Sequence, residues 1–351
     1  MLDVAGCSGT IGHDRLRRGR VSAATFGGMR AVVCQSFAPL DELVIEERPS
    51  PPLGPGQVRI AITACGVNFV DALIVQGLYQ IKPPLPFVAG GESVGIVTEV
   101  ADGVTSPQIG QRVLVTSGAG GFATEVVVPA RLAQPVPDTL TDGQAATFMQ
   151  SYMTAWFALV HRARAEAGQW LLVLGAGGGV GLGAVDVGHA LGLHVIAAAS
   201  SADKRDLATS RGAEATIDSS TEDVKQRAKD ISGDGVDLVY DPIGGSQGEQ
   251  CLRALRDDGQ FLVIGFASGD IPKLPANQVL LRNRRVTGVE WGGWVGKHPE
   301  ENQRLVEQVI VKIAAGELKP VEPTSYPFER AAQALADQQN RKVVGKAVLV
   351  V

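Results

Sequence analysis

A glycine-rich run in the middle of the chain has the composition of a phosphate-binding turn. An apolar strand is predicted over residues 170–174, and small residues follow at Ala176, Gly178 and Gly181 before a helical pattern. Small residues let backbone N–H groups approach a pyrophosphate, and a helix N-terminus offers it partial positive charge. Such turns also serve packing alone, which is the alternative. The residues predicted to touch a dinucleotide here are Ala176, Gly178, Gly179 and Val180.

The segment after the next predicted strand favours a phosphorylated cofactor. An NAD-binding domain usually carries Asp or Glu about 20 residues past the glycines, where it binds the ribose 2′-hydroxyl. This chain instead has Ser200, Ser201, Asp203, Lys204 and Arg205 there. Hydroxyls and two cations suit a 2′-phosphate, so the sequence predicts NADPH rather than NADH. The carboxylate could be a helix N-cap or a ribose ligand, and the two cations could instead form a solvated helix face.

Bulk composition is that of a globular protein with two domains. A chain of 351 residues exceeds one compact core, and 45% hydrophobic with 20% charged residues is ordinary. The net charge of −5 excludes a global basic field for nucleic acid or an anionic membrane, and no apolar run could span a bilayer. Four scattered cysteines lack metal-ligand spacing and a disulfide framework, which predicts a cytoplasmic protein.

The order of predicted elements indicates an α/β protein with one domain inserted in another. Residues 1–28 are Arg-rich without an apolar period, which predicts a disordered extension, or less readily a transit peptide, and Met29 could be the initiator. Residues 29–149 are β-rich, and residues 150–289 alternate strands with helices. Residues 290–351 return to the composition of the first part. Strands are predicted at 29–34, 57–63, 95–100, 112–116, 170–174, 194–199, 236–240, 260–264 and 343–350, and helices at 180–191 and 301–315.

Five short motifs lie at 66–71, 77–79, 86–92, 154–156 and 340–346. Together they resemble the medium-chain dehydrogenase/reductase superfamily, in its zinc-independent quinone oxidoreductase (zeta-crystallin-like) branch. The resemblance covers about residues 29–351. It implies a GroES-like β-rich catalytic domain, a doubly wound Rossmann NADPH-binding domain, and a homodimer formed through edge strands of the nucleotide-binding domain.

Departures from the zinc-dependent relatives imply a site without metal. Those relatives carry Cys where this chain has Asn68 and His where it has Gly91, and their four-cysteine structural zinc lobe is missing here. Zinc needs three or four N, S or O ligands close together, so Glu92 is expected to be a structural carboxylate. Asn68, Tyr79 and Thr154 are then predicted to line a metal-free cleft that faces the nicotinamide or the substrate. Each could instead be a buried, hydrogen-bonded polar group.

The missing metal favours an acceptor that is already electrophilic, a quinone or an α,β-unsaturated carbonyl. The predicted catalytic residues are Asn68, which positions the nicotinamide ribose or polarises the acceptor, and Tyr79, which donates a proton or a hydrogen bond to the developing oxyanion. Arg341 resembles the family arginine that meets the 2′-phosphate. Residues after the late strands, predicted to line the cofactor cleft, are Ile264, Phe266 and Trp291. The aromatic cluster of Trp291 and Trp294 could stack on a planar substrate or simply pack the domain interface.

Three functions remain open on the sequence. The favoured one is an NADPH-dependent quinone oxidoreductase. The second is an NADPH-dependent enoyl-thioester or enone reductase, and the third is a non-catalytic binding protein that carries NADPH. Fold resemblance alone does not establish function.

Overall fold

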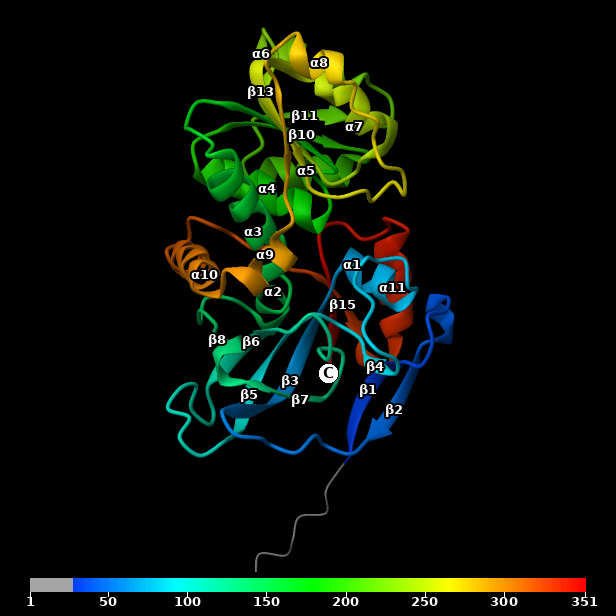
Figure 1. Cartoon of the computed structure of the whole chain (residues 1–351), viewed down its shortest axis with the longest axis vertical. Coiled ribbons are helices and arrows are strands. Elements are labelled where there is room, and N and C mark those ends of the chain that lie inside the picture. Colours follow the sequence, from blue (N-terminus) through cyan, green and yellow to red (C-terminus); the bar gives the residue numbers. More distant parts are fainter. Residues whose placement is uncertain (1–27) are drawn as a thin grey trace, which may run out of the picture.

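The computed structural model describes residues 28–351, so the predicted extension at residues 1–28 lies outside the described residues apart from Gly28. Two lobes are stacked along the long axis of the molecule (Figure 1). One is built on a parallel sheet with helices around it, and the other on mostly antiparallel sheets. The predicted fold class, an α/β chain with a GroES-like domain and a Rossmann domain, is confirmed.

The nucleotide-binding lobe contains a six-stranded parallel sheet in the order β11-β10-β9-β12-β13-β14. Its strands are β9 (Trp170–Leu174), β10 (His194–Ala199), β11 (Ala215–Asp218), β12 (Val236–Asp241), β13 (Leu255–Val263) and β14 (Arg285–Gly288). Its helices are α4 (Gly179–Ala190), α5 (Ala202–Ser210), α6 (Val224–Ser232), α7 (Gly245–Cys251) and α8 (Ala276–Leu280). The strand order reverses between β9 and β12, which opens a crevice at the carboxyl ends of these strands.

The catalytic lobe is a seven-stranded sheet in the order β15-β16-β3-β5-β6-β8, with β7 paired to β3. Its strands are β3 (Gln57–Val67), β5 (Glu92–Val100), β6 (Arg112–Thr116), β7 (Glu125–Pro129), β8 (Ala133–Pro135), β15 (Thr324–Pro327) and β16 (Ala347–Val350). A smaller sheet joins β2 (Val44–Arg48), β1 (Met29–Cys34) and β4 (Phe87–Val88). Alternate side chains of β3 are buried over residues 57–64, as the alternating sequence predicts, and the residues at 65–67 are all buried.

The chain returns to its first lobe at its end. Strand β16 pairs antiparallel with β3, with Ala347 opposite Val67 and Val350 opposite Ala64. The final strand was predicted over residues 343–350 but begins only at Ala347. The reason is Gly345, whose φ of +79° takes the backbone out of the extended conformation before the strand.

Helices between the lobes complete the core. The short α2 (Asp142–Ala145) precedes α3 (Met149–Trp156), which continues as a π-helix over Phe157–Ala163. α9 (Trp291–Lys297) leads into α10 (Pro299–Ala314), which packs against α3 between the lobes (Figure 1). The buried face of α10 belongs to the same hydrophobic cluster as α3 and α4. The predicted domain boundaries stay a prediction.

The remaining helices belong to the catalytic lobe, where α1 (Phe69–Val75) packs against α11 (Ala331–Gln339). Short 3-10 turns lie at Leu40–Glu42, Ala130–Leu132, Leu252–Ala254 and Phe328–Arg330. Over residues 28–351, no helix has both the length and the apolar character needed to cross a membrane.

Candidate active site

The glycine-rich turn connects β9 to α4 and leaves one side open. Gly178 is the N-cap of α4, and a Cβ added to it would have only the Gly175 carbonyl oxygen nearby, at 3.6 Å. A Cβ on Gly181 would instead overlap the backbone of Gly175 and Ala176. One glycine thus keeps room for a ligand, whereas the other lets the helix pack closely on the strand. Ala176 is fully buried and Val180 is half-buried.

The C-terminal motif lies directly against this turn. The Gly345 N–H donates to the Gly177 carbonyl at 2.9 Å, and Gly345 forms a parallel bridge with Gly178. The motif at 340–346 and the turn were identified separately in the sequence, and only the fold brings them together. The turn is therefore built from both lobes.

Two cations from the two lobes meet beside the turn. The Lys204 Nζ donates to the Arg341 backbone carbonyl at 2.9 Å, and the Arg341 Nη2 donates to the Ala267 carbonyl at 3.0 Å. Burial and then the charge of Arg341 lower the pKa of Lys204. Within residues 28–351, neither cation has a carboxylate within ion-pair distance. Two like charges held together without a counter-ion provide a place for an anion.

The N-terminus of α5 lies at the same place. Ser201 is the N-cap of this helix, so the interpretation of Asp203 as the N-cap is wrong, and Asp203 lies exposed in the first turn. Ser200 and Ser201 are both exposed and can donate hydrogen bonds to a ligand.

Arg205 faces the other way. Its Nη1 lies 3.1 Å from the Asp218 carboxylate and 3.2 Å from the Ala199 carbonyl. Both contacts fasten α5 to the ends of β10 and β11. Its predicted contact with the cofactor stays a prediction.

Two residues predicted to line the cofactor cleft belong to the loop after β13. The Ile264 N–H donates to the Asp241 carbonyl at 3.0 Å, which ties the loop to the end of β12. Phe266 is 41% exposed and precedes Ala267, the residue that accepts the Arg341 hydrogen bond. This loop therefore lies beside the two cations.

Asn68 belongs to a buried polar cluster. Its Nδ2 donates to the Glu92 Oε2 at 3.3 Å, its Oδ1 accepts a hydrogen bond from the Lys346 Nζ, and its backbone N–H donates to the Asp71 Oδ2 at 2.8 Å. The second Glu92 oxygen accepts the Met149 N–H at 2.7 Å. Sequence reasoning missed Asp71 and Lys346 as members of this site. The sequence feature that could have indicated Lys346 is its position directly before an apolar, buried strand.

Burial dominates the electrostatics of this cluster. It raises the pKa of Asp71 to about 7, although the Asn68 N–H and the Lys346 charge oppose the shift. Burial also raises the pKa of Glu92. It lowers the pKa of Lys346, and the charges of Glu92 and Asp71 oppose that lowering. Two acidic groups and one ammonium thus share one dry site. The ammonium favours the charged form of both carboxyl groups, whereas the charge of Glu92 adds to the rise in the pKa of Asp71.

Tyr79 lies in the catalytic lobe within electrostatic reach of Glu290. It is half-buried, and burial together with the charge of Glu290 raises the pKa of its hydroxyl. Glu290 is itself fixed, because its carboxylate accepts the Gly293 N–H at 2.7 Å as the N-cap of α9. The phenol is therefore held in its protonated, hydrogen-bond-donating form. Thr154 is half-buried on α3, and its Oγ1 donates to the Gln150 carbonyl at 2.7 Å.

Comparisons with known proteins agree with this architecture. Residues 54–138 match the family model of the alcohol dehydrogenase GroES-like domain, and residues 179–310 match that of zinc-binding dehydrogenase. A quinone oxidoreductase-like protein 2 homolog from Nematostella vectensis is 38% identical over 325 residues, 91% of this chain and 88% of the relative. The chain belongs to the medium-chain dehydrogenase/reductase superfamily. It is a quinone oxidoreductase-like member and an oxidoreductase of this type, as the resemblance implied.

Solved structures of this superfamily have the same fold. The Escherichia coli quinone oxidoreductase complexed with NADPH has a TM-score of 0.82 at 27% identity, covering 92% of this chain and 100% of that one. The quinone oxidoreductase from Thermus thermophilus, also solved in complex with NADPH, has a TM-score of 0.78 at 30% identity, with the same two coverages.

The predicted absence of a catalytic zinc concerns Asn68, Gly91 and Glu92, and it stays a prediction. Asn68 and Gly91 stand in place of Cys and His, and both oxygens of Glu92 already accept hydrogen bonds. In the part of the chain that the structure describes, no three His, Cys, Asp or Glu side chains are grouped to hold a metal ion.

The two tryptophans of α9 have different surroundings. Trp294 packs between Phe157 and His298, with ring centroids 4.8 Å from each, which favours a packing role. Trp291 is half-buried, and its Nε1 donates to the Asn302 Oδ1 at 2.8 Å. Contact between Trp291 and the cofactor or substrate stays a prediction.

Proposed function

We propose that this oxidoreductase binds NADPH and reduces a quinone. The observation that carries the proposal is the pairing of Lys204 with Arg341, two cations without a carboxylate partner in residues 28–351, next to the glycine-rich turn. An adenosine 2′-phosphate supplies the missing negative charge, and the Ser201 hydroxyl adds a donor. The open side of the turn at Gly178 and the N-terminus of α4 suit the diphosphate.

The acceptor follows from the groups at the reacting end. NADPH, when bound, supplies a hydride, and a proton from solvent completes the hydroquinone. Asn68 and Tyr79 offer hydrogen-bond donors to the oxygen on which charge develops, and neither is a Lewis acid. Such a site suits an acceptor that is electrophilic before it binds. Removing the hydroxyl proton of an alcohol needs a stronger base or a metal ligand set, which Asn68 and Gly91 do not provide.

An acceptor panel tests the proposal. The purified protein should oxidise NADPH with 1,4-benzoquinone and should not reduce NADP with simple primary alcohols. 2-Alkenals and an enoyl-CoA are the other members of the panel. Faster turnover with either of these than with any quinone would assign the enone or enoyl-thioester reductase activity instead. Tight NADPH binding without turnover of any acceptor would support the third function, a non-catalytic protein that binds NADPH.

The cytoplasmic location and the homodimer are part of the same proposal. Cys34, Cys65 and Cys251 are free and buried, which suits a reducing compartment. β14 is an outer strand of the parallel sheet, and its Val286 is 43% exposed, so this edge can pair with a second copy. Sedimentation equilibrium tests the dimer, since a monomer at micromolar concentration would contradict it.

A further inference from the structure

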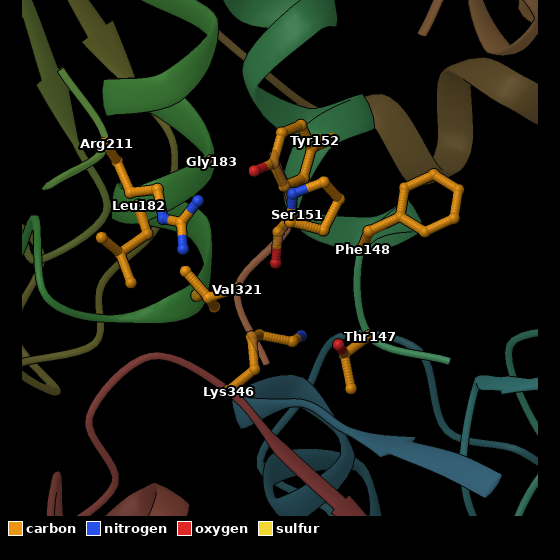
Figure 2. A pocket seen from close by; sticks show the side chains of 11 residues that line it. Thr147, Phe148, Ser151, Tyr152, Leu182, Gly183, Arg211, Val321 and Lys346 are labelled. Carbon is orange, nitrogen blue, oxygen red and sulfur yellow. The ribbon is translucent and has the colours of Figure 1, made fainter. Parts of the chain in front are cut away.

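Lys346 links the catalytic lobe to the glycine-rich turn. It is buried just before β16, and Figure 2 shows its side chain extending from the C-terminal strand toward α3, near Thr147 and Ser151. Its methylene stem packs on Gly179, where an added Cβ would overlap the Lys346 Cδ. Its ammonium reaches past the turn to the Asn68 side chain. One side chain therefore touches both the first residue of α4 and a residue at the reacting end.

The partners of Asn68 fix which way its amide points. An ammonium only donates hydrogen bonds, so Lys346 requires the amide oxygen on its side. The carboxylate of Glu92 accepts, so it requires the amide nitrogen on the other side, at 3.3 Å. The oxygen thus already accepts the hydrogen bond from the ammonium, and within the described residues one N–H of the amide has no acceptor. Asn68 can therefore offer this N–H to a ligand as a hydrogen-bond donor.

We propose that Lys346 is a positioning residue, which holds the Asn68 amide as a hydrogen-bond donor to the oxygen of the acceptor molecule. The inference rests on the proposed function, because it assigns the reacting end of the same site. A cation on the amide oxygen also withdraws electrons from the amide, which strengthens the remaining N–H as a donor. The oxygen of a quinone gains negative charge as the hydride arrives, so this donor stabilises the transition state more than the bound substrate.

Lys346→Met tests the assignment with a small change in shape. Methionine keeps an unbranched stem beneath Gly179 and removes the ammonium. We expect kcat with 1,4-benzoquinone to fall about 10-fold to 100-fold, as for the loss of a hydrogen bond to a charged group. KM and the Kd for NADPH should stay within about threefold, because the turn keeps its support. Lys342→Met is the matched control, since Lys342 lies in the same segment with a side chain 67% exposed, and it should leave kcat, KM and the Kd for NADPH unchanged.

NMR can monitor the Asn68 side-chain amide independently of turnover. The chain has only five asparagines, so side-chain amides labelled with 15N on asparagine alone can be assigned by single substitutions. The Asn68 amide resonances should move in Lys346→Met and stay in place in Lys342→Met. Lys346→Gln keeps a donor without the charge, and its kcat should lie between those of wild type and Lys346→Met. If Lys346→Met does not fold, Lys346→Gln carries the test with the same readouts.

The outcomes separate this inference from the proposed function. A wild-type protein that reduces no acceptor contradicts the proposed function, while the Asn68 resonances still report on the role of Lys346. Resonances that do not move in Lys346→Met, or an unchanged kcat, overturn the positioning role. A Kd for NADPH that weakens by the same factor as kcat would also overturn it, because the lysine would then only support the turn.

Discussion

The Lys204 Nζ and the Arg341 backbone carbonyl are joined by a hydrogen bond of 2.9 Å. Lys204 is in α5 of the nucleotide-binding lobe, whereas Arg341 is in the C-terminal motif of the other lobe. The contact brings two positive charges together, which is favourable only when an anion compensates them. Cofactor preference should therefore depend on residues from both lobes.

Lys204→Met should remove the preference for NADPH over NADH. Its stem still covers Gly177, so the turn keeps its packing. Loss of one charged contact to a phosphate should weaken NADPH binding about 10-fold to 100-fold, while NADH binding changes little. Fluorescence titration with both cofactors measures this, with Lys225→Met on α6 as the control. Equal affinity of the wild-type protein for the two cofactors would sink the assignment of the phosphate site.

Arg205→Ala should affect stability more than cofactor preference. Its guanidinium joins Asp218 and the Ala199 carbonyl, so its loss loosens α5 from the sheet. We expect Tm to fall by a few degrees and the ratio of NADPH to NADH affinity to change less than in Lys204→Met. Arg227→Ala removes a more exposed ion pair on α6 and serves as the control. An Arg205 variant with a normal Tm and no NADPH preference would place this guanidinium on the phosphate.

Tyr79→Phe should lower kcat modestly, by about 2-fold to 10-fold, as for one neutral hydrogen bond. Burial and the Glu290 charge raise the pKa of the phenol, so the hydroxyl stays protonated and acts by orienting the acceptor. Below about pH 10, the ordinary pKa of a phenol, the pH profile of kcat should therefore have the same shape in wild type and in the Phe variant. A loss of about 100-fold or more would make Tyr79 the proton donor instead.

Asp71→Asn should stabilise the protein increasingly as the pH rises. The pKa of Asp71 is raised from 3.8 to about 7 in the folded protein. Between these values the folded state holds a proton that the unfolded state has lost, so this group makes stability fall as the pH rises through that window. The difference in Tm between Asp71→Asn and wild type should therefore grow from about pH 4 to about pH 7 and then level off. Asp102→Asn, at an exposed turn, should show no such trend.

Chelation should leave activity intact. Asn68 and Gly91 replace the Cys and His of the zinc-dependent relatives, and no metal-binding group of three side chains exists in the described chain. Dialysis against EDTA followed by a quinone assay, with elemental analysis of the same sample, measures this. Stoichiometric zinc whose removal abolishes turnover would overturn the interpretation of the site.

Local sequence was enough for much of the fold. The strands at 29–34, 112–116 and 194–199 have the predicted bounds, and the predicted helix after the glycine-rich turn begins at Gly179. Each of these features depends on the spacing of hydrophobic residues, on glycine at a particular position or on a helix start. Each such signal is contained in a few neighbouring residues of the sequence. The same holds for the turn itself, since its small residues and the strand before it are contiguous.

The chemistry of the site depended on the tertiary structure. Lys346 and Asn68 are 278 positions apart, and Lys204 and Arg341 are 137 apart, so no local pattern links either pair. Pairing of β16 with β3 and of Gly345 with Gly178 brings them together. The same packing directs Arg205 to Asp218, although its sequence position suggested the cofactor. An ammonium is stable in a dry interior only where carboxylates and an amide meet it, and that meeting is decided by the packing of the whole chain.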